Sequence, residues 1–261
     1  MADVDLVADR AIMAFVRDSR RARGLTRVGQ FLLMFTAATK HRYLNYAIPD
    51  DDADPSAADL DLLVEAFRNA DRMPRLEFLP TVAPALEARL LDHGFSVEER
   101  LPLMTCTRTS ARRLEPPEGV RISVPFDDAT MLAMASLQHD IFDDPEPADA
   151  SSVARLRFGL ERGARALVAV DGTTGATAGA AQCVPPAGGA TEVVGVAVAP
   201  SHRRRGLAAA MVSALVTECF DAGLITVFLE AAPGADGAYR NAGFVRTSTS
   251  VHISLEEEGD A

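Results

Sequence analysis

Hydrophobic and polar positions along the first 110 residues alternate between two periods. Apolar residues recur every three to four positions in some segments, as on one face of a helix, while other segments are short apolar runs typical of strands. The predicted helices are 3–20, 56–70 and 84–94, and the predicted strands are 28–37, 43–49, 75–80 and 95–107. Ser56 stands where the second helix begins and is expected to be its N-cap.

The second half of the chain repeats this alternation. The predicted strands are 120–125, 191–200, 225–231 and 244–255, with a hairpin at 164–185 that turns at "DGTTG", and the predicted helices are 127–142, 152–163, 205–222 and 234–242. Between the halves, "RTSARRLEPPEG" is polar and holds two consecutive prolines, which is typical of a linker. The pattern predicts mixed α/β lobes at 1–110 and 119–261, joined by a linker at 111–118.

The two halves match at two places, nearly in register. Aligning Pro49 with Pro200 superposes two strand–Pro–turn–helix segments, and "RLLDHGF" (89–95) then matches "AYRNAGF" (238–244). Two matches at nearly the same offset favour a duplicated α/β unit. In the first copy, however, carboxylates replace the arginines of the second copy's turn, and Pro55 takes the place of Gly206.

Composition narrows the class of protein. The hydrophobic share of 48% and charged share of 24% are those of a packed globular chain, and no apolar run is long enough to span a bilayer. An acidic N-terminus without the features of a signal peptide predicts a cytoplasmic protein, and a net charge of −11 predicts that it binds neither nucleic acid nor a membrane. A single lysine among many arginines suggests a bacterial source.

The histidines and cysteines do not predict a metal site. The five histidines form no closely spaced ligand pair, and the three cysteines are far apart in the sequence. Cys106, Cys183 and Cys219 are therefore expected to be buried, inert thiols.

Three arginines stand where the helix at 205–222 is predicted to begin, in "PSHRRRGLAAAMV" (200–212). A helix N-terminus has unpaired N–H groups and a partial positive charge, so acidic residues would be expected there. Gly206 and Ala208 leave room for a ligand to approach the backbone. N–H groups and guanidinium donors together suit a pyrophosphate, so the turn predicts a site for a polyanion.

This stretch resembles the acetyl-CoA signature of the GNAT N-acetyltransferase superfamily, in which a strand is followed by Pro-x-x-Arg/Gln-x-x-Gly-x-Gly/Ala. Arg203, Gly206 and Ala208 occupy its defining positions. The segment "AYRNAGF" resembles the family's later "LYxxxGF" element, with Tyr239 at the tyrosine position. The resemblance covers 119–255, and the whole chain resembles tandem-GNAT proteins whose first lobe is degenerate.

The resemblance implies that acetyl-CoA binds the second lobe as a co-substrate. Backbone groups of Val196, Ala197 and Val198 would pair with the pantetheine arm like an added strand, and an N–H near Val196 would polarise the thioester carbonyl. The pyrophosphate would be held by Arg203 and by the N–H groups of the turn and first helical residues, namely Arg204, Arg205, Gly206, Leu207, Ala208 and Ala209.

The resemblance implies that Tyr239 is the general acid that protonates the departing CoA thiolate. An amine must be neutral to attack the acetyl carbonyl, so a base should take its proton, and Glu192 and Glu230 are candidates because each lies at a strand end. His202 is expected to be a surface residue rather than the base. Candidates to attract a cationic acceptor are the acids of the loop after 127–142, namely Asp143, Asp144 and Glu146.

The sequence thus predicts an α/β protein of two GNAT-like lobes that transfers an acetyl group to an amine by direct attack in a ternary complex. The alternative is a non-catalytic acyl-CoA sensor or scaffold, and Tyr239 favours the enzyme because a binder needs no acid there. The acceptor stays open between a small molecule and a peptide, and the assembly between a monomer and a homodimer. The first lobe is expected not to bind CoA, because aspartates repel pyrophosphate and proline has no N–H to donate.

Overall fold

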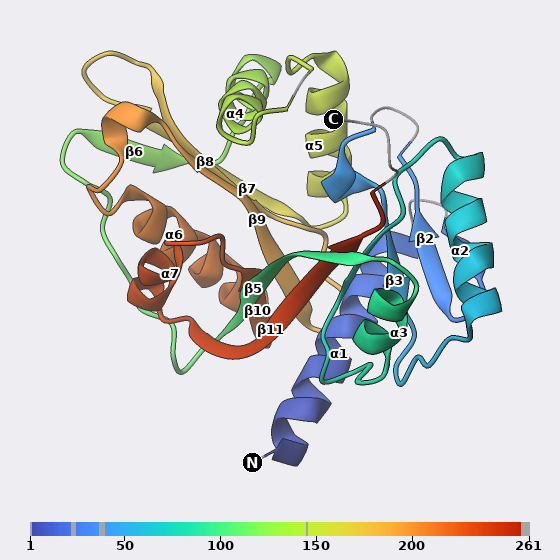
Figure 1. The fold of residues 1–261 in the computed structure, drawn as a ribbon. Coiled ribbons are helices and arrows are strands. Elements are labelled where there is room, and N and C mark those ends of the chain that lie inside the picture. Colours follow the sequence, from blue (N-terminus) through green and yellow to red (C-terminus); the bar gives the residue numbers. More distant parts are fainter. Residues whose placement is uncertain (1, 22–24, 37–39, 145, 257–261) are drawn as a thin grey trace. The chain divides into compact units, whose positions relative to one another are not determined.

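The computed structural model describes residues 2–21, 25–36, 40–144 and 146–256, and it confirms a mixed α/β fold. The chain forms two compact units: unit 1 comprises Met1–Leu103 and Thr247–Ala261, and unit 2 comprises Met104–Arg246 (Figure 1). The C-terminal strand therefore packs mainly within unit 1, whereas a linear division at 111–118 assigns it to the second half.

Unit 1 contains three α-helices, one 3₁₀ helix and strands in the order β1-β2-β3-β4-β11-β5 within its described residues. The helices are α1 (Ala2–Arg21), η1 (Arg42–Leu44), α2 (Ala57–Asn69) and α3 (Leu86–Asp92). The strands are β1 (Thr26–Val28), β2 (Phe31–Met34), β3 (Tyr46–Pro49), β4 (Arg75–Phe78), β5 (Ser96–Thr107) and β11 (Val245–Ser254), of which the last residues of β5 and the first two of β11 belong to unit 2. Strands β3 and β4 are parallel, while β1–β2, β2–β3 and β4–β11 are antiparallel.

In unit 1 one predicted strand is wrong and one predicted N-cap is confirmed. The prediction of a single strand at 28–37 is wrong, because the chain reverses direction at Gly29 and forms the β1–β2 hairpin. Gly29 has a φ of 51°, a conformation that glycine adopts easily because it has no Cβ. Ser56 is confirmed as the N-cap of α2: its Oγ accepts from the Asp59 N–H at 3.3 Å, and the Asp59 carboxylate accepts from the Ser56 N–H at 2.9 Å.

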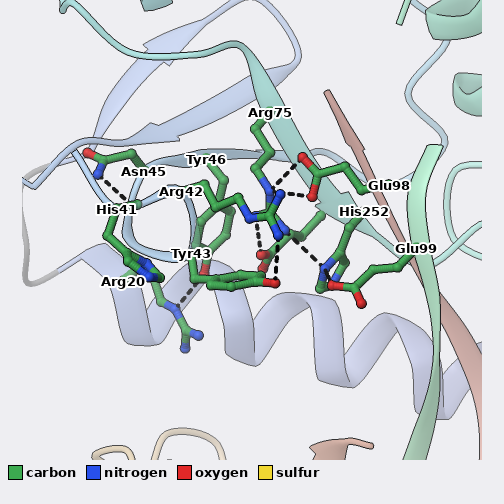
Figure 2. A network of polar contacts seen from close by, with 11 residues as sticks. Arg20, His41, Arg42, Tyr43, Asn45, Tyr46, Arg75, Glu98, Glu99 and His252 are labelled. Atoms are coloured by element: carbon green, nitrogen blue, oxygen red, sulfur yellow. Dashed lines mark hydrogen bonds and ion pairs between the residues drawn. The ribbon is translucent and has the colours of Figure 1, made fainter. Parts of the chain in front are cut away.

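A buried arginine joins the strands of unit 1 (Figure 2). Arg75 on β4 has no exposed side-chain surface, and its Nε donates to both carboxylate oxygens of Glu98 on β5, at 3.1 and 3.0 Å. The guanidinium also pairs with Glu77, and its Nη2 donates to Nδ1 of His252 on β11 at 3.0 Å. The ring of Tyr43 lies 4.9 Å from the guanidinium carbon. The cation is thus surrounded by partners instead of water.

Unit 2 contains four α-helices, one 3₁₀ helix and strands in the order β10-β9-β8-β7-β6 within its described residues. The strands are β6 (Val120–Ser123), β7 (Arg165–Asp171), β8 (Thr177–Cys183), β9 (Ala190–Val198) and β10 (Thr226–Glu230). The helices are α4 (Asp128–Ile141), α5 (Ala150–Glu161), η2 (Pro200–His202), α6 (Leu207–Asp221) and α7 (Asp236–Ala242). The strands from β6 to β9 are antiparallel, β9 and β10 are parallel, and the β7–β8 hairpin turns at 171–175 as predicted.

Both faces of the part of the sheet formed by β6 to β10 are covered. Helices α4 and α5 lie on one face, and α6 with α7 lies on the other (Figure 1). Two apolar clusters fill the two interfaces, the larger one beneath α6. The cysteines are buried as expected, and the Sγ atoms of Cys183 and Cys219 lie 3.6 Å apart. This packing fixes the N-terminal end of α6 beside the end of β9.

Candidate active site

The turn between β9 and α6 has the backbone geometry of an anion site. After η2 the chain passes through Arg204 at a φ of 59° and reaches Gly206, the N-cap of α6, at a φ of 82°. No side chain caps this helix and no acid lies in its first turn. The first intrahelical bond runs from the Ala210 N–H to the Gly206 carbonyl at 3.0 Å, so the preceding N–H groups of α6 are available to a ligand.

A cavity of about 300 Å³ lies against this turn. It is lined by Val198, His202, Arg203, Arg204, Gly206, Leu207, Ala208, Ala209, Ala238 and Asn241. A Cβ built on Gly206 would meet no atom within 4 Å, so the space before the turn is open. Most of the predicted phosphate-binding residues therefore border one cavity; Arg205 borders a neighbouring cavity, and Val196 and Ala197 do not line either one.

The arginines of this turn are not neutralised by carboxylates. All three are exposed, and none of them is ion-paired within the described residues. The Arg203 Nε donates to the Val198 carbonyl at 3.2 Å, and the Arg205 Nη2 donates to the Glu118 carbonyl at 3.0 Å. Each guanidinium keeps further donors for an anion. In a chain of net charge −11, this local excess of positive charge favours a polyanionic ligand.

The corresponding turn of unit 1 has the opposite arrangement. The buried Pro55 has no N–H to donate, and the aspartates are bound by arginines of the same unit. These ion pairs are Arg27–Asp50 at 2.7 Å, Arg17–Asp51 at 2.6 Å, Arg10–Asp52 at 2.7 Å and Arg89–Asp54 at 2.8 Å. The aspartates of this turn thus face guanidinium groups of their own unit.

His202 is buried, so the expectation of a surface residue is wrong. Its Nε2 lies 2.8 Å from Oδ2 of Asp171, and its Nδ1 lies 2.9 Å from Oγ of Ser201. Asp171 also accepts from the N–H groups of Thr174 and Thr173 at 2.9 and 2.8 Å. The Thr174 N–H, His202 and the Thr173 N–H hold the pKa of Asp171 well below its usual value. The pair ties the turn between β9 and α6 (residues 200–206, called the phosphate turn after its predicted ligand) to the β7–β8 hairpin.

Replacing Asp171 by asparagine is expected to lower the melting temperature at neutral pH. Because the folded-state pKa of Asp171 is depressed, its stabilising contribution is present above the unfolded value of 3.8 and is lost as the pH falls below it. Thermal denaturation between pH 3 and 7 should show a gap between wild type and variant that narrows below about pH 3.8. A gap of constant size across this range would contradict the assignment.

Strands β9 and β10 separate beside the cavity. Their parallel pairing covers only Ala190–Glu192 against Thr226–Phe228 among the described pairs. Beyond Glu192 the edge of β9 that faces β10 has no described strand partner in unit 2, and this edge includes Val196 to Val198. An extended ligand could pair with it by adding to the sheet.

A bulge in β9 fixes the backbone at the same place. Ala180 pairs with Ala197 and Gln182 pairs with Val194, so two residues of β9, Gly195 and Val196, oppose one of β8. Gly195 has a φ of 62°, and the Gln138 Nε2 on α4 donates to its carbonyl at 2.7 Å. The carbonyl of Gly195 and the N–H of Val196 belong to one trans peptide and point in opposite directions. Gln138 therefore sets the direction of the Val196 N–H.

For the acetyl transfer that the sequence resemblance implies, replacing Gln138 by leucine is expected to lower kcat up to about tenfold, with little change in the KM for acetyl-CoA. One hydrogen bond of roughly 1 kcal/mol holds the peptide whose N–H is the expected carbonyl donor. Steady-state kinetics on Gln138→Leu test this, with Ser136→Ala on the same helix as a control because that hydroxyl binds only the Leu132 carbonyl. Equal kcat values for both variants would contradict the role.

Tyr239 lies on α7 in the larger apolar cluster and is 8% exposed. Its ring meets Phe244 edge-on, with centroids 6.3 Å apart. Burial raises the pKa of the phenol, so the hydroxyl stays protonated at neutral pH. Ala238 and Asn241 of the same helix line the cavity, whereas Tyr239 does not.

The remaining candidates lie on different elements. Glu192 on β9 is in register with Phe228, and Glu230 ends β10; both are half-buried. The loop acids are not equivalent. Asp144 accepts from the Glu146 N–H at 3.1 Å and approaches Nδ1 of His139 at 3.7 Å, so its carboxylate faces its own loop. The carboxylates of Asp143 and Glu146 are exposed.

Sequence reasoning missed Gln138, Gly195 and the His202–Asp171 pair. A glycine inside the apolar run "VVGVAV" was the available signal for a bulge. The search for a metal site gives no group of three or more His, Cys, Asp or Glu side chains among the described residues. Within the same residues, none of the helices has the length and apolar character needed to cross a membrane.

Comparisons of the sequence and of the structure with known proteins both find GNAT acetyltransferases. Residues 131–244 match the model of the Acetyltransferase (GNAT) family. A GCN5-related N-acetyltransferase from Kribbella flavida has 23% identity and a TM-score of 0.78, over 95% of this chain and 96% of the other. One from Sphaerobacter thermophilus has 16% identity and a TM-score of 0.67, over 100% and 96%.

A third structure, a tandem GNAT protein from the clavulanic acid biosynthesis pathway, has 15% identity and a TM-score of 0.62, over 88% of this chain and 79% of the other. A search of curated protein sequences finds no match. The matched segment contains the phosphate turn, the bulge and Tyr239. The chain thus has the fold of GNAT proteins, and its residues 131–244 are similar to the GNAT acetyltransferase family.

Proposed function

We propose that the protein is an acetyl-CoA-dependent N-acetyltransferase with one donor site per chain, in unit 2. The observation that carries the proposal is the turn from Arg203 to Gly206, where N–H groups of α6 and the guanidinium groups of Arg203 and Arg204, which are not ion-paired within the described residues, line a cavity. This arrangement suits the pyrophosphate of CoA. The β9 edge beyond Glu192, which has no described strand partner in unit 2, would take the pantetheine arm, and the thioester would then lie near the bulge at Gly195.

The acetyl group would pass directly from sulfur to a neutral amine. The amine nitrogen attacks the carbonyl carbon, the carbonyl oxygen takes negative charge beside the Val196 N–H, and the C–S bond breaks as the tetrahedral intermediate collapses. Tyr239 would give its proton to the leaving thiolate, and a base would take the proton of the amine. Glu192 and Glu230 are the candidates for this base, and the exposed carboxylates of Asp143 and Glu146 would attract a cationic acceptor.

We further propose that unit 1 is a degenerate GNAT-like lobe with a structural role, in a bacterial, cytoplasmic protein. The ion-paired aspartates of its turn support this role, because they leave no positive site for pyrophosphate. A small-molecule or peptide amine is the acceptor class that fits the proposed reaction.

The test is release of free CoA thiol from acetyl-CoA in the presence of a panel of small amines, polyamines and peptide N-termini. Amine-dependent release by the wild type, lost in Tyr239→Phe, supports an enzyme. Tight acetyl-CoA binding without release for any amine would support the alternative of a sensor. A wild type that neither binds nor turns over acetyl-CoA would overturn both.

A further inference from the structure

A second cavity, of about 380 Å³, lies on the other side of the phosphate turn. It shares Gly206, Ala209 and Asn241 with the first cavity, so the two spaces adjoin at the N-terminal end of α6. A ligand whose pyrophosphate lies at Gly206 can extend from one space into the other.

The wall of this second cavity is formed by the linker between the halves of the chain. Arg112, Leu114, Glu115 and Pro117 line it, facing Arg205 of the turn. These residues lie outside the segment 131–244 that matches the family model, apart from Arg205. The linker therefore adds residues to the site from outside the matched segment.

Hydrogen bonds hold the linker in place against α6 and α7. Ser213 Oγ on α6 donates to the Arg112 carbonyl at 2.7 Å and accepts from the Leu114 N–H at 2.9 Å. The Arg112 N–H donates to the Ala242 carbonyl at 3.1 Å. Gly243 permits this approach, because a Cβ there would lie 2.1 Å from the Ser110 carbonyl oxygen. These hydrogen bonds hold the linker in one position, so the cavity wall is preorganised.

The chemistry of the wall combines cations with apolar surface. The guanidinium groups of Arg112 and Arg205 are exposed, and neither is ion-paired within the described part of the chain. Glu115 is the one carboxylate among the lining residues, so positive charge is in excess. Leu114 and Pro117 are half-buried and supply apolar contact. Guanidinium donors beside apolar side chains suit a phosphorylated nucleoside.

We infer that the linker binds the 3′-phosphoadenosine end of the donor, with Arg112 and Arg205 on the 3′-phosphate and with Leu114 and Pro117 against the adenosine. This inference rests on the proposed function, since it assumes that the pyrophosphate lies at Gly206.

The experiment is calorimetric titration of CoA and of dephospho-CoA, which lacks only the 3′-phosphate, into the full-length wild type and three variants. Arg112→Ala removes the linker cation, Glu115→Gln removes the opposing carboxylate, and Arg113→Ala is the matched control, because Arg113 is an exposed neighbour that does not line the cavity. The wild type should bind CoA at least tenfold more tightly than dephospho-CoA. Arg112→Ala should lose most of this preference, Glu115→Gln should increase it, and Arg113→Ala should keep it.

Equal affinities of the wild type for the two ligands would overturn the inference and leave the proposed function intact. A preference that Arg112→Ala and Arg113→Ala reduce equally would also overturn it, since general charge rather than the cavity wall would then account for the effect. Absence of binding by either ligand to the wild type would instead overturn the proposed function. As a second readout, acetyl-phosphopantetheine should support at most a tenth of the turnover that acetyl-CoA supports at equal, subsaturating concentration.

Discussion

Replacing Tyr239 by phenylalanine is expected to lower kcat by about 10²- to 10⁴-fold, with little change in the KM for acetyl-CoA. The substitution removes only the hydroxyl, and the ring keeps its edge contact with Phe244. Because the phenol has no described hydrogen-bond partner in the protein, its removal leaves no buried group unpaired. The loss therefore falls on the step in which the thiolate leaves.

The pH dependence gives a second readout on the same residue. Burial raises the pKa of Tyr239 above the ordinary value of 10, so the protonated acid persists beyond pH 10. The wild-type rate should show no alkaline decline from this group below pH 10. Steady-state kinetics from pH 7 to 10 on wild type and Tyr239→Phe check both expectations, with Tyr43→Phe in unit 1 as the control. A kcat for Tyr239→Phe equal to that of the control would exclude the general-acid role.

Replacing Arg75 by alanine is expected to cost about 3–5 kcal/mol of unfolding free energy. The guanidinium is fully buried and is the shared partner of Glu77, Glu98 and His252, and Figure 2 shows its contacts with Glu98 and His252. Desolvation and these carboxylates act on Arg75 in opposite directions, and its pKa is raised on balance. Without the guanidinium, two half-buried carboxylates lose a buried cationic partner.

Urea denaturation measures this cost. The control is Arg89→Ala, which removes an exposed arginine whose partner, Asp54, is exposed too, so its midpoint should shift very little. The His252 ring lies 3.1 Å from Glu99 as well, so the same loss should loosen β11 against β5. Equal midpoints for Arg75→Ala and Arg89→Ala would show that the network contributes no stability.

The positions of most elements follow from the hydrophobic periodicity. The amphipathic helices and apolar strands of unit 2 lie within a few residues of the predicted ranges, because each buries one face or both faces in a local sheet. The anion site at the phosphate turn could be predicted for a different reason: its helix begins with arginines and glycine, whereas acidic residues are preferred at a helix N-terminus. The local sequence pattern is therefore sufficient to predict both the positions of these elements and the phosphate turn.

Long-range pairings could not be predicted in this way. The C-terminal strand pairs with β4, which lies far away in the sequence, and no local pattern encodes that choice. The burial of His202 depends on Asp171 in another hairpin, and the orientation of the Gly195 peptide depends on Gln138 in another helix. Each contact joins elements that only tertiary packing brings together.

The measurement that tests the central claim most directly is calorimetric titration of acetyl-CoA into the wild type and an Arg203→Ala/Arg204→Ala variant. Arg162→Ala is the control, since Arg162 is exposed and follows α5, away from the turn in sequence, and lines neither cavity. We predict one site per chain, weakened at least tenfold in the double variant, or about 1.4 kcal/mol, and unchanged in the control. Two sites per chain, or equal affinity in wild type and double variant, would contradict a single donor site at the turn of unit 2.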